Sequence, residues 1–206
     1  MKKSSRVFDV HEAFVVDRRV RRLAALLSQA PPQNASVLDV GCGSGEVLAE
    51  IVRLRPDLAG EAKGIDVLIR PETMLPIEYF DGTTIPYPDK SFDVVTFVDV
   101  LHHTEDPLVL LKEARRVART QVLVKDHVNE GSIDRLTLRF MDWVGNARHG
   151  VNLPYNYLSR AEWYRVISDA GLEVRDWRGR LDMYPPPARW VFDRGLHMVA
   201  TLTPSH

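Results

Sequence analysis

The sequence predicts a doubly wound α/β domain, in which helices cover both faces of a seven-stranded, mostly parallel sheet whose last strand is antiparallel. Three observations support this fold class. Short runs rich in β-branched residues alternate with segments of helical period along the 206 residues. A glycine-rich turn joins an early strand to a helix. The last two predicted strands follow one another without a helix between them, which favours an antiparallel hairpin at one edge of the sheet.

The first three elements are a helix, a strand and a second helix. Apolar residues such as Phe14, Leu23 and Leu27 recur at helical spacing from about residue 8 to residue 30, where two prolines end the pattern. Residues 36–40 form a short apolar run that stops at glycines, which is typical of a buried parallel strand. A second helix is predicted from residue 46 to about residue 55, before Pro56.

The central elements alternate strand and helix. Strands are predicted at residues 63–67, 77–80, 92–98 and 121–125, and the run FDVVTFV at 92–98 is the clearest of them. Asp106-Pro107 begins the helix before the last of these strands, because proline fits the first helical turn.

The C-terminal part begins with a long irregular stretch and ends in two strands. Ser159 and Glu162 have the spacing of a capping box, and Gly171 ends the helix that they begin. Strands are predicted at residues 172–177 and 196–202.

The composition is that of an ordinary globular protein, with 45% hydrophobic and 27% charged residues. The length fits a single domain over residues 1–206, with residues 1–34 as an N-terminal helical cap. A net charge of −1 gives no overall attraction to nucleic acid. We interpret one short basic run as the solvent-facing side of the first helix: Arg18, Arg19, Arg21 and Arg22.

The single cysteine, Cys42, excludes an internal disulfide bond. The chain has no apolar run near the roughly 20 residues of a membrane span and no signal-peptide core. We therefore expect a cytoplasmic protein without a membrane span. Nothing in the sequence indicates the oligomeric state.

The strongest functional signal is the run from Val37 to Glu46, VLDVGCGSGE, in which Gly41, Gly43 and Gly45 follow a strand and precede a helix. Glycine tolerates positive φ and lets a ligand approach the backbone closely, as a turn beneath a nucleotide-like ligand requires. The strand–turn–helix context makes this pattern more specific than a lone glycine motif.

Two acidic positions complete the pattern. Asp66 ends the next predicted strand, where a carboxylate can accept both ribose hydroxyls of a nucleotide, although a turn former at a strand end is an alternative. Asp81-Gly82 follows the third predicted strand. It could meet an adenine ring with a carboxylate and a backbone amide, or it could be an ordinary turn.

The runs VLDVGCGSGEVLAEI, GID and DGTTIPYPDKSFDVVTFVDVLHHTEDP together resemble the class I S-adenosylmethionine (SAM)-dependent methyltransferases, in particular the type 11 group, over about residues 35–125. The resemblance implies a Rossmann-like fold and SAM as cofactor, with S-adenosylhomocysteine as product. It also implies three sets of cofactor contacts: the methionine part by Asp39, Gly41, Cys42, Gly43 and Gly45; the ribose by Asp66 and the adenine by Asp81 and Gly82; and the methionine side, past the fourth strand, by Asp99 and His102.

One departure from the family lies between Asp66 and Asp81, where only 14 residues replace the usual helix and strand. We expect the helix there to be short or missing and the adenine pocket to be more open.

Other readings are weaker. A nicotinamide-dependent oxidoreductase usually has glycine at the position of Glu46, and a phosphate-binding loop needs a Gly-Lys-Ser/Thr sequence that this chain lacks. A SAM-binding domain without catalysis, acting through a partner, stays open. So does a nucleic-acid or protein methyltransferase, although the charge does not favour nucleic acid. A small molecule is the default acceptor.

Methyl transfer needs a general base only where the acceptor must lose a proton. His127 and His103 are the candidates, since they follow the fifth and fourth strands at the end of the sheet where ligands bind. The pair His102-His103 is common in this group of methyltransferases and could instead shape the cofactor pocket. We predict no metal site.

Residues 127–158 are too long for a plain connection, and we interpret them as an insertion that covers the acceptor together with the N-terminal helix. The part from residue 133 to residue 144 has helical spacing. The insertion carries Phe140, Met141, Trp143, Arg148, His149, Tyr155 and Tyr157, and its aromatic residues suggest a flat or apolar acceptor. A packing helix followed by a surface loop is the alternative.

Overall fold

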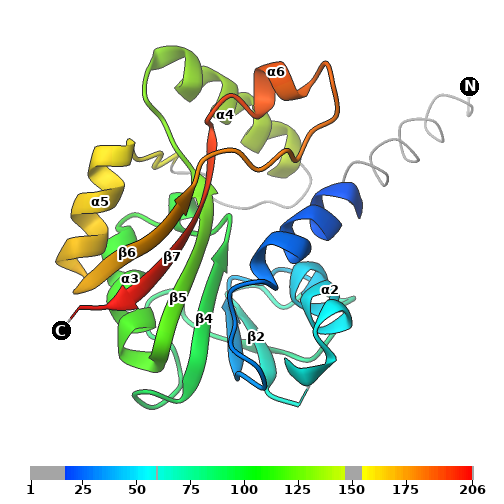
Figure 1. Cartoon of the computed structure of the whole chain (residues 1–206), viewed down its shortest axis with the longest axis vertical. Helices are drawn as coiled ribbons and strands as arrows, with labels where there is room; N and C mark the ends of the chain where they lie inside the picture. Colours follow the sequence, from blue (N-terminus) through cyan, green and yellow to red (C-terminus); the bar gives the residue numbers. More distant parts are fainter. Residues whose placement is uncertain (1–16, 59, 147–154, 206) are drawn as a thin grey trace, which may run out of the picture.

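The computed structural model describes residues 17–58, 60–146 and 155–205, and gives only the backbone of residues 144–146. The strands form one seven-stranded sheet in the order β3-β2-β1-β4-β5-β7-β6 (Figure 1). Their bounds are β1 Val37–Val40, β2 Ala62–Asp66, β3 Ile77–Tyr79, β4 Phe92–Val98, β5 Ala118–His127, β6 Leu172–Arg178 and β7 His197–Pro204.

The directions of the strands confirm the predicted fold class. The pairs β1–β2, β2–β3, β1–β4 and β4–β5 are parallel, whereas β7 is antiparallel to both β5 and β6. Strand β5 is longer than predicted and follows the preceding helix directly at Ala118.

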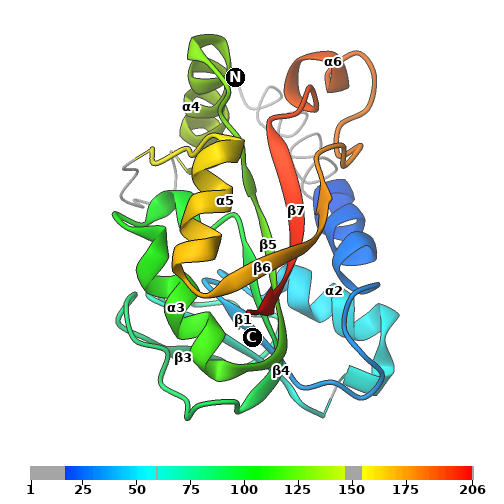
Figure 2. The same ribbon diagram turned by 60° about the vertical axis from the view of Figure 1, so that its left-hand side comes forward.

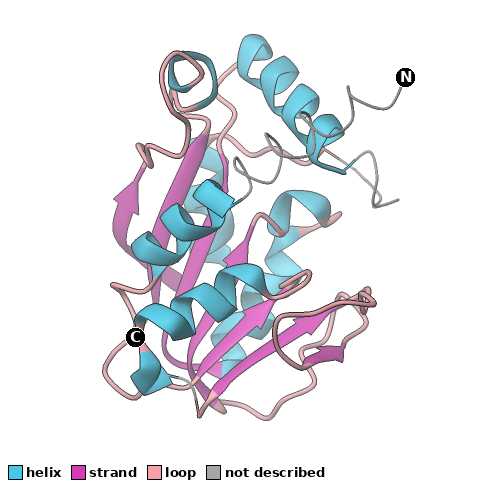
Figure 3. Cartoon of the chain, turned by 90° about the vertical axis from the view of Figure 1, so that its right-hand side faces the viewer, coloured by secondary structure: helices cyan, strands magenta, loops and turns pink. Residues whose placement is uncertain are grey.

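Helices cover both faces of the sheet (Figure 2; Figure 3). On one face, α3 (Pro107–Val117) and α5 (Arg160–Asp169) pack in the larger apolar cluster with β4 and β5. On the other face, the N-terminal helix, described over residues 17–27, packs with α2 (Glu46–Leu54) and the short helix η1 (Pro56–Leu58). The part of the predicted first helix from residue 8 to residue 16, including Phe14, lies outside the described residues.

Local sequence signals begin these helices as predicted. The Asp106 carboxylate accepts the Leu108 amide at 2.9 Å in front of α3, and Pro107 occupies the first turn. Ser159 and Glu162 form the complete capping box of α5. Each cap satisfies amides that have no partner within the helix.

Between β2 and β3 the described chain contains no helix, as the short spacing predicts. The segment 67–76 instead folds back over the glycine turn. The Met74 amide donates to the Ser44 carbonyl at 2.8 Å, and the Leu75 side chain lies beside Gly45.

The remaining helices are α4 (Ser132–Asn146), α6 (Arg189–Phe192) and the short η2 (Leu101–His103). Helices α4 and α6 stand at the end of the molecule where β5 ends and β7 begins (Figure 1). None of the described helices combines the length and the apolar content that crossing a membrane would need.

Candidate functional site

The site lies where the carboxyl ends of β1, β2, β4 and β5 meet, the position at which open α/β sheets bind ligands. Its centre is the glycine turn after β1. Gly41, Gly43 and Gly45 have φ of 72°, 63° and 81°, and Gly45 is the N-cap of α2. These left-handed values explain the glycine spacing, because a residue with a Cβ rarely adopts them.

Gly41 also permits a close approach between two loops. A Cβ at this position would lie 2.6 Å from Cγ2 and 2.8 Å from Cγ1 of Val100, which follows β4. The backbone of the turn after β1 therefore packs directly against the Val100 side chain, and no space is left for a methyl group at Gly41.

Two buried carboxylates flank the turn. Asp66 accepts the Gly43 amide at 2.8 Å and the Leu68 amide at 2.9 Å. Asp39 accepts the Thr96 hydroxyl at 2.7 Å. Burial, opposed by the Thr96 hydrogen bond and aided by the charge of Asp66, raises the pKa of Asp39 to about 7.

Cys42 packs inside the turn. A Cβ at Gly64 would lie 2.6 Å from the Cys42 sulfur, so the thiol rests against the backbone of β2. Burial, followed by the charges of Asp39 and Asp66, raises the pKa of this thiol. Both observations are typical of a small packing residue and do not favour a nucleophile at Cys42.

The loop after β2 supplies a residue that the sequence did not single out. The Arg70 guanidinium lies 3.4 Å from the place that a Cβ on Gly43 would occupy. The segment 67–76 thus forms a wall of the site and brings a positive charge to the glycine turn. A lone arginine in an irregular stretch carries no spacing signal by which sequence reasoning could find it.

Asp81 and Gly82 form a turn at the other end of this region. Oδ1 of Asp81 accepts the Thr83 amide at 2.7 Å, the Thr83 hydroxyl at 2.9 Å and the Thr84 amide at 2.7 Å. These hydrogen bonds lower the pKa of Asp81. Gly82 has a φ of 85° and lies close to Val67. Asp81 therefore forms an ordinary turn through Oδ1, as the alternative interpretation expected, and its Oδ2 remains for other contacts.

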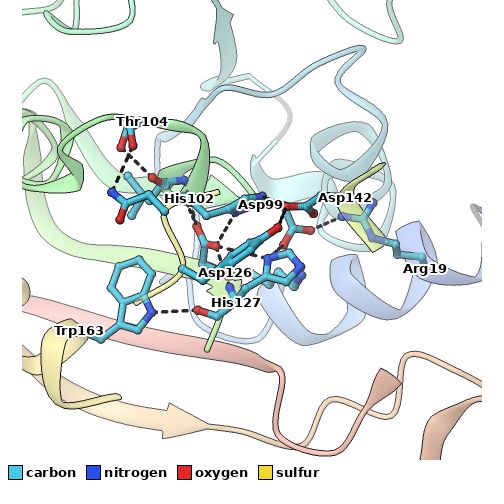
Figure 4. Close-up of polar contacts among 12 residues, drawn as sticks. Arg19, Asp99, His102, Thr104, Asp126, His127, Asp142 and Trp163 are labelled. Carbon is cyan, nitrogen blue, oxygen red and sulfur yellow. Dashed lines mark hydrogen bonds and ion pairs between the residues drawn. The ribbon is translucent and has the colours of Figure 1, made fainter. Parts of the chain in front are cut away.

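The second half of the site is a buried ion network centred on Asp99 (Figure 4). Asp99 directly follows β4 and has a φ of 56°, and its carboxylate pairs with Lys125 on β5 and with Arg19 on the N-terminal helix. Burial alone would raise the pKa of Asp99, but Lys125 and Arg19 hold it well below its usual range. Lys125 is only 1% exposed, so Asp99 is its main source of compensation.

Arg19 corrects part of the interpretation of the basic run. Arg21 is solvent-facing as predicted and pairs with Asp17. Arg18 and Arg22 are exposed but donate to the Met183 and Leu181 carbonyls in the irregular segment that follows β6. Arg19 instead points into the site. The spacing that predicts an outer helix face does not reveal that a carboxylate 80 residues away turns one of the four inward.

Asp126 organises the histidines. Its Oδ1 lies 2.6 Å from Nδ1 of His102 and accepts the His127 amide at 2.7 Å, and its Oδ2 accepts the Leu101 amide at 2.9 Å. Nε2 of His102 lies 3.5 Å from Oδ2 of Asp142, which comes from α4. Burial lowers the pKa of His102, but Asp126 and Asp142 outweigh it and the pKa is raised. His102 thus lies between two carboxylates, which favour its protonated form.

The neighbouring histidines His103, His127 and His197 have lowered pKa values, which favours their neutral form. The His103 ring contacts that of His102 with centroids 3.9 Å apart and planes inclined by 45°. Burial together with the charge of His102 lowers the pKa of His103 to about 4. The ring centroids of His127 and His102 lie 4.5 Å apart, and burial lowers the pKa of His127 as well. His197, which the sequence did not single out, is 2% exposed and lies beside His127, with ring centroids 5.0 Å apart and planes inclined by 57°.

Four groups in this network could in principle hold a metal ion, because ligand atoms of Asp99, His102, Asp126 and His127 lie within 4.8 Å of one another. Both carboxylates, however, already accept protein donors on each oxygen, and Lys125 supplies positive charge against Asp99. The described side chains therefore form a charge-compensated network, and we assign no metal to it.

The structure divides the residues of the predicted covering insertion. Tyr157 is buried and donates to Asp142, and it packs with Leu138 on α4 and with Leu196. Phe140 and Trp143 lie on the opposite side of α4 and are exposed. Arg148 and His149 lie outside the described residues. Helix α4 thus contributes to the site through its inner face only.

An open, doubly wound sheet with a glycine turn after its first strand and an acidic residue at the end of the next is the arrangement of a class I SAM-dependent methyltransferase, as the sequence motifs implied. A family model described as a methyltransferase domain matches residues 11–176, and the chain belongs to this family.

Individual relatives agree with this membership. The 27-O-demethylrifamycin SV methyltransferase of Amycolatopsis mediterranei is 29% identical over 120 residues, which cover 52% of this chain and 44% of the relative. The ubiquinone biosynthesis O-methyltransferase of Ralstonia nicotianae is 27% identical over 205 residues, which cover 89% of this chain and 82% of the relative. The chain spans about half the length of several other curated relatives that it matches.

The fold is also that of a chain from the complex between the Haloferax volcanii Trm112 methyltransferase activator and the putative methyltransferase. The two chains superpose with a TM-score of 0.67 at 18% identity, and the match covers 94% of this chain and 97% of the other.

Proposed function

We propose that the chain binds SAM at the glycine turn and transfers its methyl group to a small-molecule acceptor in front of His103 and His127. The observation that carries this proposal is the left-handed glycine turn in direct contact with the buried Asp66 carboxylate. A carboxylate oxygen has lone pairs left after accepting one amide, so Asp66 can still accept ribose hydroxyls. The residues present therefore fit the cofactor.

The proposed contacts follow the order of the strands. Asp39, Gly41, Cys42, Gly43 and Gly45 would hold the methionine part, Asp66 the ribose, and Asp81 with Gly82 the adenine. The Arg70 guanidinium beside Gly43 adds a charge suited to the cofactor's carboxylate.

Asp99 and His102 have a different part in the proposal. Their side chains are engaged with Lys125 and Asp126, and His102 is 2% exposed. We propose that they shape the methionine side of the pocket without contacting the cofactor directly. They hold in place the segment after β4, whose Val100 packs on Gly41.

The bound cofactor supplies an activated methyl group, so the protein mainly aligns the acceptor and excludes water. Alignment of this kind contributes roughly 7–11 kcal/mol in favourable cases. His103 and His127 are available as neutral bases, because the pKa of each is lowered. Either imidazole can take a proton from a hydroxyl acceptor during transfer.

Two facts support a small hydroxyl-bearing acceptor. The names of both relatives described above refer to methylation at oxygen. The net charge of −1 provides no attraction to a nucleic-acid backbone. The inner face of α4 and Tyr157 would close the acceptor side.

Cofactor binding is tested by calorimetric titration of the purified chain with S-adenosylhomocysteine. We expect binding, and we expect Asp66→Asn to weaken it by about tenfold or more, since the amide side chain loses the charge and one acceptor oxygen. Asp169→Asn, on the exposed end of α5, is the matched control and should bind as the parent does. An absence of heat and of thermal shift with the parent chain contradicts the proposal.

Catalysis is tested separately, by release of S-adenosylhomocysteine with a panel of small hydroxylated acceptors. We expect His127→Ala or His103→Ala to lower turnover, and a change below a few-fold removes that histidine from the mechanism. A chain that binds the cofactor but turns over no acceptor in any class favours the alternative of a SAM-binding domain that acts through a partner.

A further inference from the structure

Helix α4 is apolar on two opposite sides. Its inner side packs into the protein through Leu138, which is fully buried, and through Asp142. Its outer side carries four large apolar side chains at helical spacing, which are 72%, 69%, 55% and 60% exposed in chain order: Ile133, Leu136, Phe140 and Trp143. Positions three, seven and ten residues after the first fall on one side of a helix, so the four form a continuous stripe.

This stripe is large for a surface feature. Because a large apolar or aromatic side chain carries on the order of 150–250 Å² of surface, the four together expose roughly 400–600 Å². A patch of this size on a single chain usually marks an interaction site. Helix α4 alone supplies it, and the polar side chains of the same helix do not interrupt it.

Helix α6 extends the apolar surface at the same end of the molecule (Figure 2). Trp190 is 69% and Val191 46% exposed. Arg194, two residues after α6, donates to Asp134 at 3.1 Å and to Thr137 at 3.0 Å, so the end of α6 is tied to α4. The two helices thus offer apolar side chains from one connected region.

The charge around this region is positive. Arg135 and Arg139 on α4 and Arg189 on α6 are exposed, and none of them forms an ion pair within the described part of the chain. The Arg139 guanidinium lies over the Tyr155 ring, 4.8 Å from its centroid. The acidic groups of α4 are already engaged: Asp134 with Arg194, and Asp142 in the buried network. The overall charge of the chain is close to zero, but this face presents unpaired arginines beside an apolar stripe.

Two partners could cover this face: a second copy of the chain or a lipid bilayer, and the area and charge of the face favour the bilayer. A second copy of the chain would bury about 800 Å² on each side, so it would have to cover the charged residues that flank the stripe together with the stripe itself. A symmetric pair would also bring like-charged arginines together. A bilayer with anionic lipids accepts apolar side chains below its headgroups and attracts arginines at them, which is how amphipathic interfacial helices bind.

We propose that the outer face of α4, defined by Ile133, Leu136, Phe140 and Trp143, docks this protein on a membrane surface that carries anionic lipids. The inner face of the same helix brings Asp142 to the site, so docking places the acceptor side of the sheet next to the bilayer. The proposal does not depend on the methyl-transfer reaction, and its test requires no turnover.

The test is co-sedimentation of the full chain with vesicles of phosphatidylcholine alone or mixed with phosphatidylglycerol. We expect the parent chain to bind the vesicles that contain phosphatidylglycerol more tightly than those of phosphatidylcholine alone, and we expect salt to weaken this binding. Phe140→Ser/Trp143→Ser should reduce the affinity tenfold or more. Arg135→Gln/Arg139→Gln should reduce binding to the anionic vesicles and remove most of the dependence on salt.

The matched control is Val109→Ser, which removes an apolar side chain that is 41% exposed on α3. It should bind as the parent does, and melting curves establish that every variant is folded. No binding by the parent chain, or equal binding by the Phe140/Trp143 variant, overturns the proposal. A concentration-dependent dimer that this variant abolishes, without vesicle binding, also overturns it and assigns the face to a second copy.

Discussion

Replacing Gly41 with alanine perturbs the centre of the proposed cofactor site in a way that the structure makes quantitative. The φ of 72° places the new Cβ in the left-handed region, which costs about 1–2 kcal/mol. The same Cβ would meet Val100 at 2.6 and 2.8 Å. Val100 is β-branched and cannot turn away freely, so the overlap adds about 1–3 kcal/mol. We expect a loss of about 2–5 kcal/mol of folding free energy.

Thermal unfolding and calorimetry with S-adenosylhomocysteine measure the two consequences. For a chain of this length the loss corresponds to a decrease in Tm on the order of 4–20 °C. Affinity should fall at least tenfold, because the turn can relieve the overlap only by moving away from the segment after β4. The double variant Gly41→Ala/Val100→Ala should recover the part of the loss that comes from overlap and keep the part that comes from φ.

Gly131→Ala is the matched control, since nothing lies within 4 Å of a Cβ at that position. A Gly41→Ala chain that melts within about 2 °C of this control and binds the ligand equally well would refute the reasoning.

Three further predictions concern buried charge and a helix cap. Because the pKa of Asp39 is raised from its ordinary 3.8 to about 7, its stabilising contribution is complete below pH 3.8 and is lost as the pH rises through 7. Asp39→Asn should therefore match the parent in urea unfolding at low pH and exceed it by up to about 4 kcal/mol above pH 7, and a difference that does not vary with pH contradicts this. Lys125→Met leaves Asp99 with Arg19 as its one remaining ion-pair partner among the described cations, and should lower the free energy of unfolding in urea by about 3–5 kcal/mol. The double variant Asp99→Asn/Lys125→Met should recover most of this loss. If it recovers none, the buried pair is not the cause. Ser159→Ala removes the cap of α5 and should cost about 1 kcal/mol, measured as a decrease in Tm of roughly 2–4 °C; an unchanged Tm would mean that the cap is dispensable.

Much of the fold follows from local signals in the sequence. The β-branched run at 92–98 is a strand, and the caps at Asp106 and Ser159 begin helices, because each depends on residues close together in the chain. The short spacing between Asp66 and Asp81 likewise predicts the missing helix. The assignment of a single domain and the roles of the individual site residues stay predictions.

The site was predictable only in part, for a reason of distance along the chain. The glycine turn and Asp66 belong to one strand–turn–helix–strand unit, so spacing places them together. The carboxylate of Asp99 instead meets Arg19, which is 80 residues away in the sequence. No periodicity reports such a contact, because it depends on how whole elements pack.

Helix α4 illustrates the same division. The sequence by itself determines that residues 133–144 are helical and apolar on more than one side. Only the tertiary structure decides which side is buried: Leu138 and Asp142 face inward, and the stripe containing Phe140 and Trp143 faces outward. The physical reason is that Tyr157 and His102 lie on the inner side and satisfy the Asp142 carboxylate there. An amphipathic pattern specifies that a helix has distinct sides, and the partners brought by the rest of the chain select the side that leaves water.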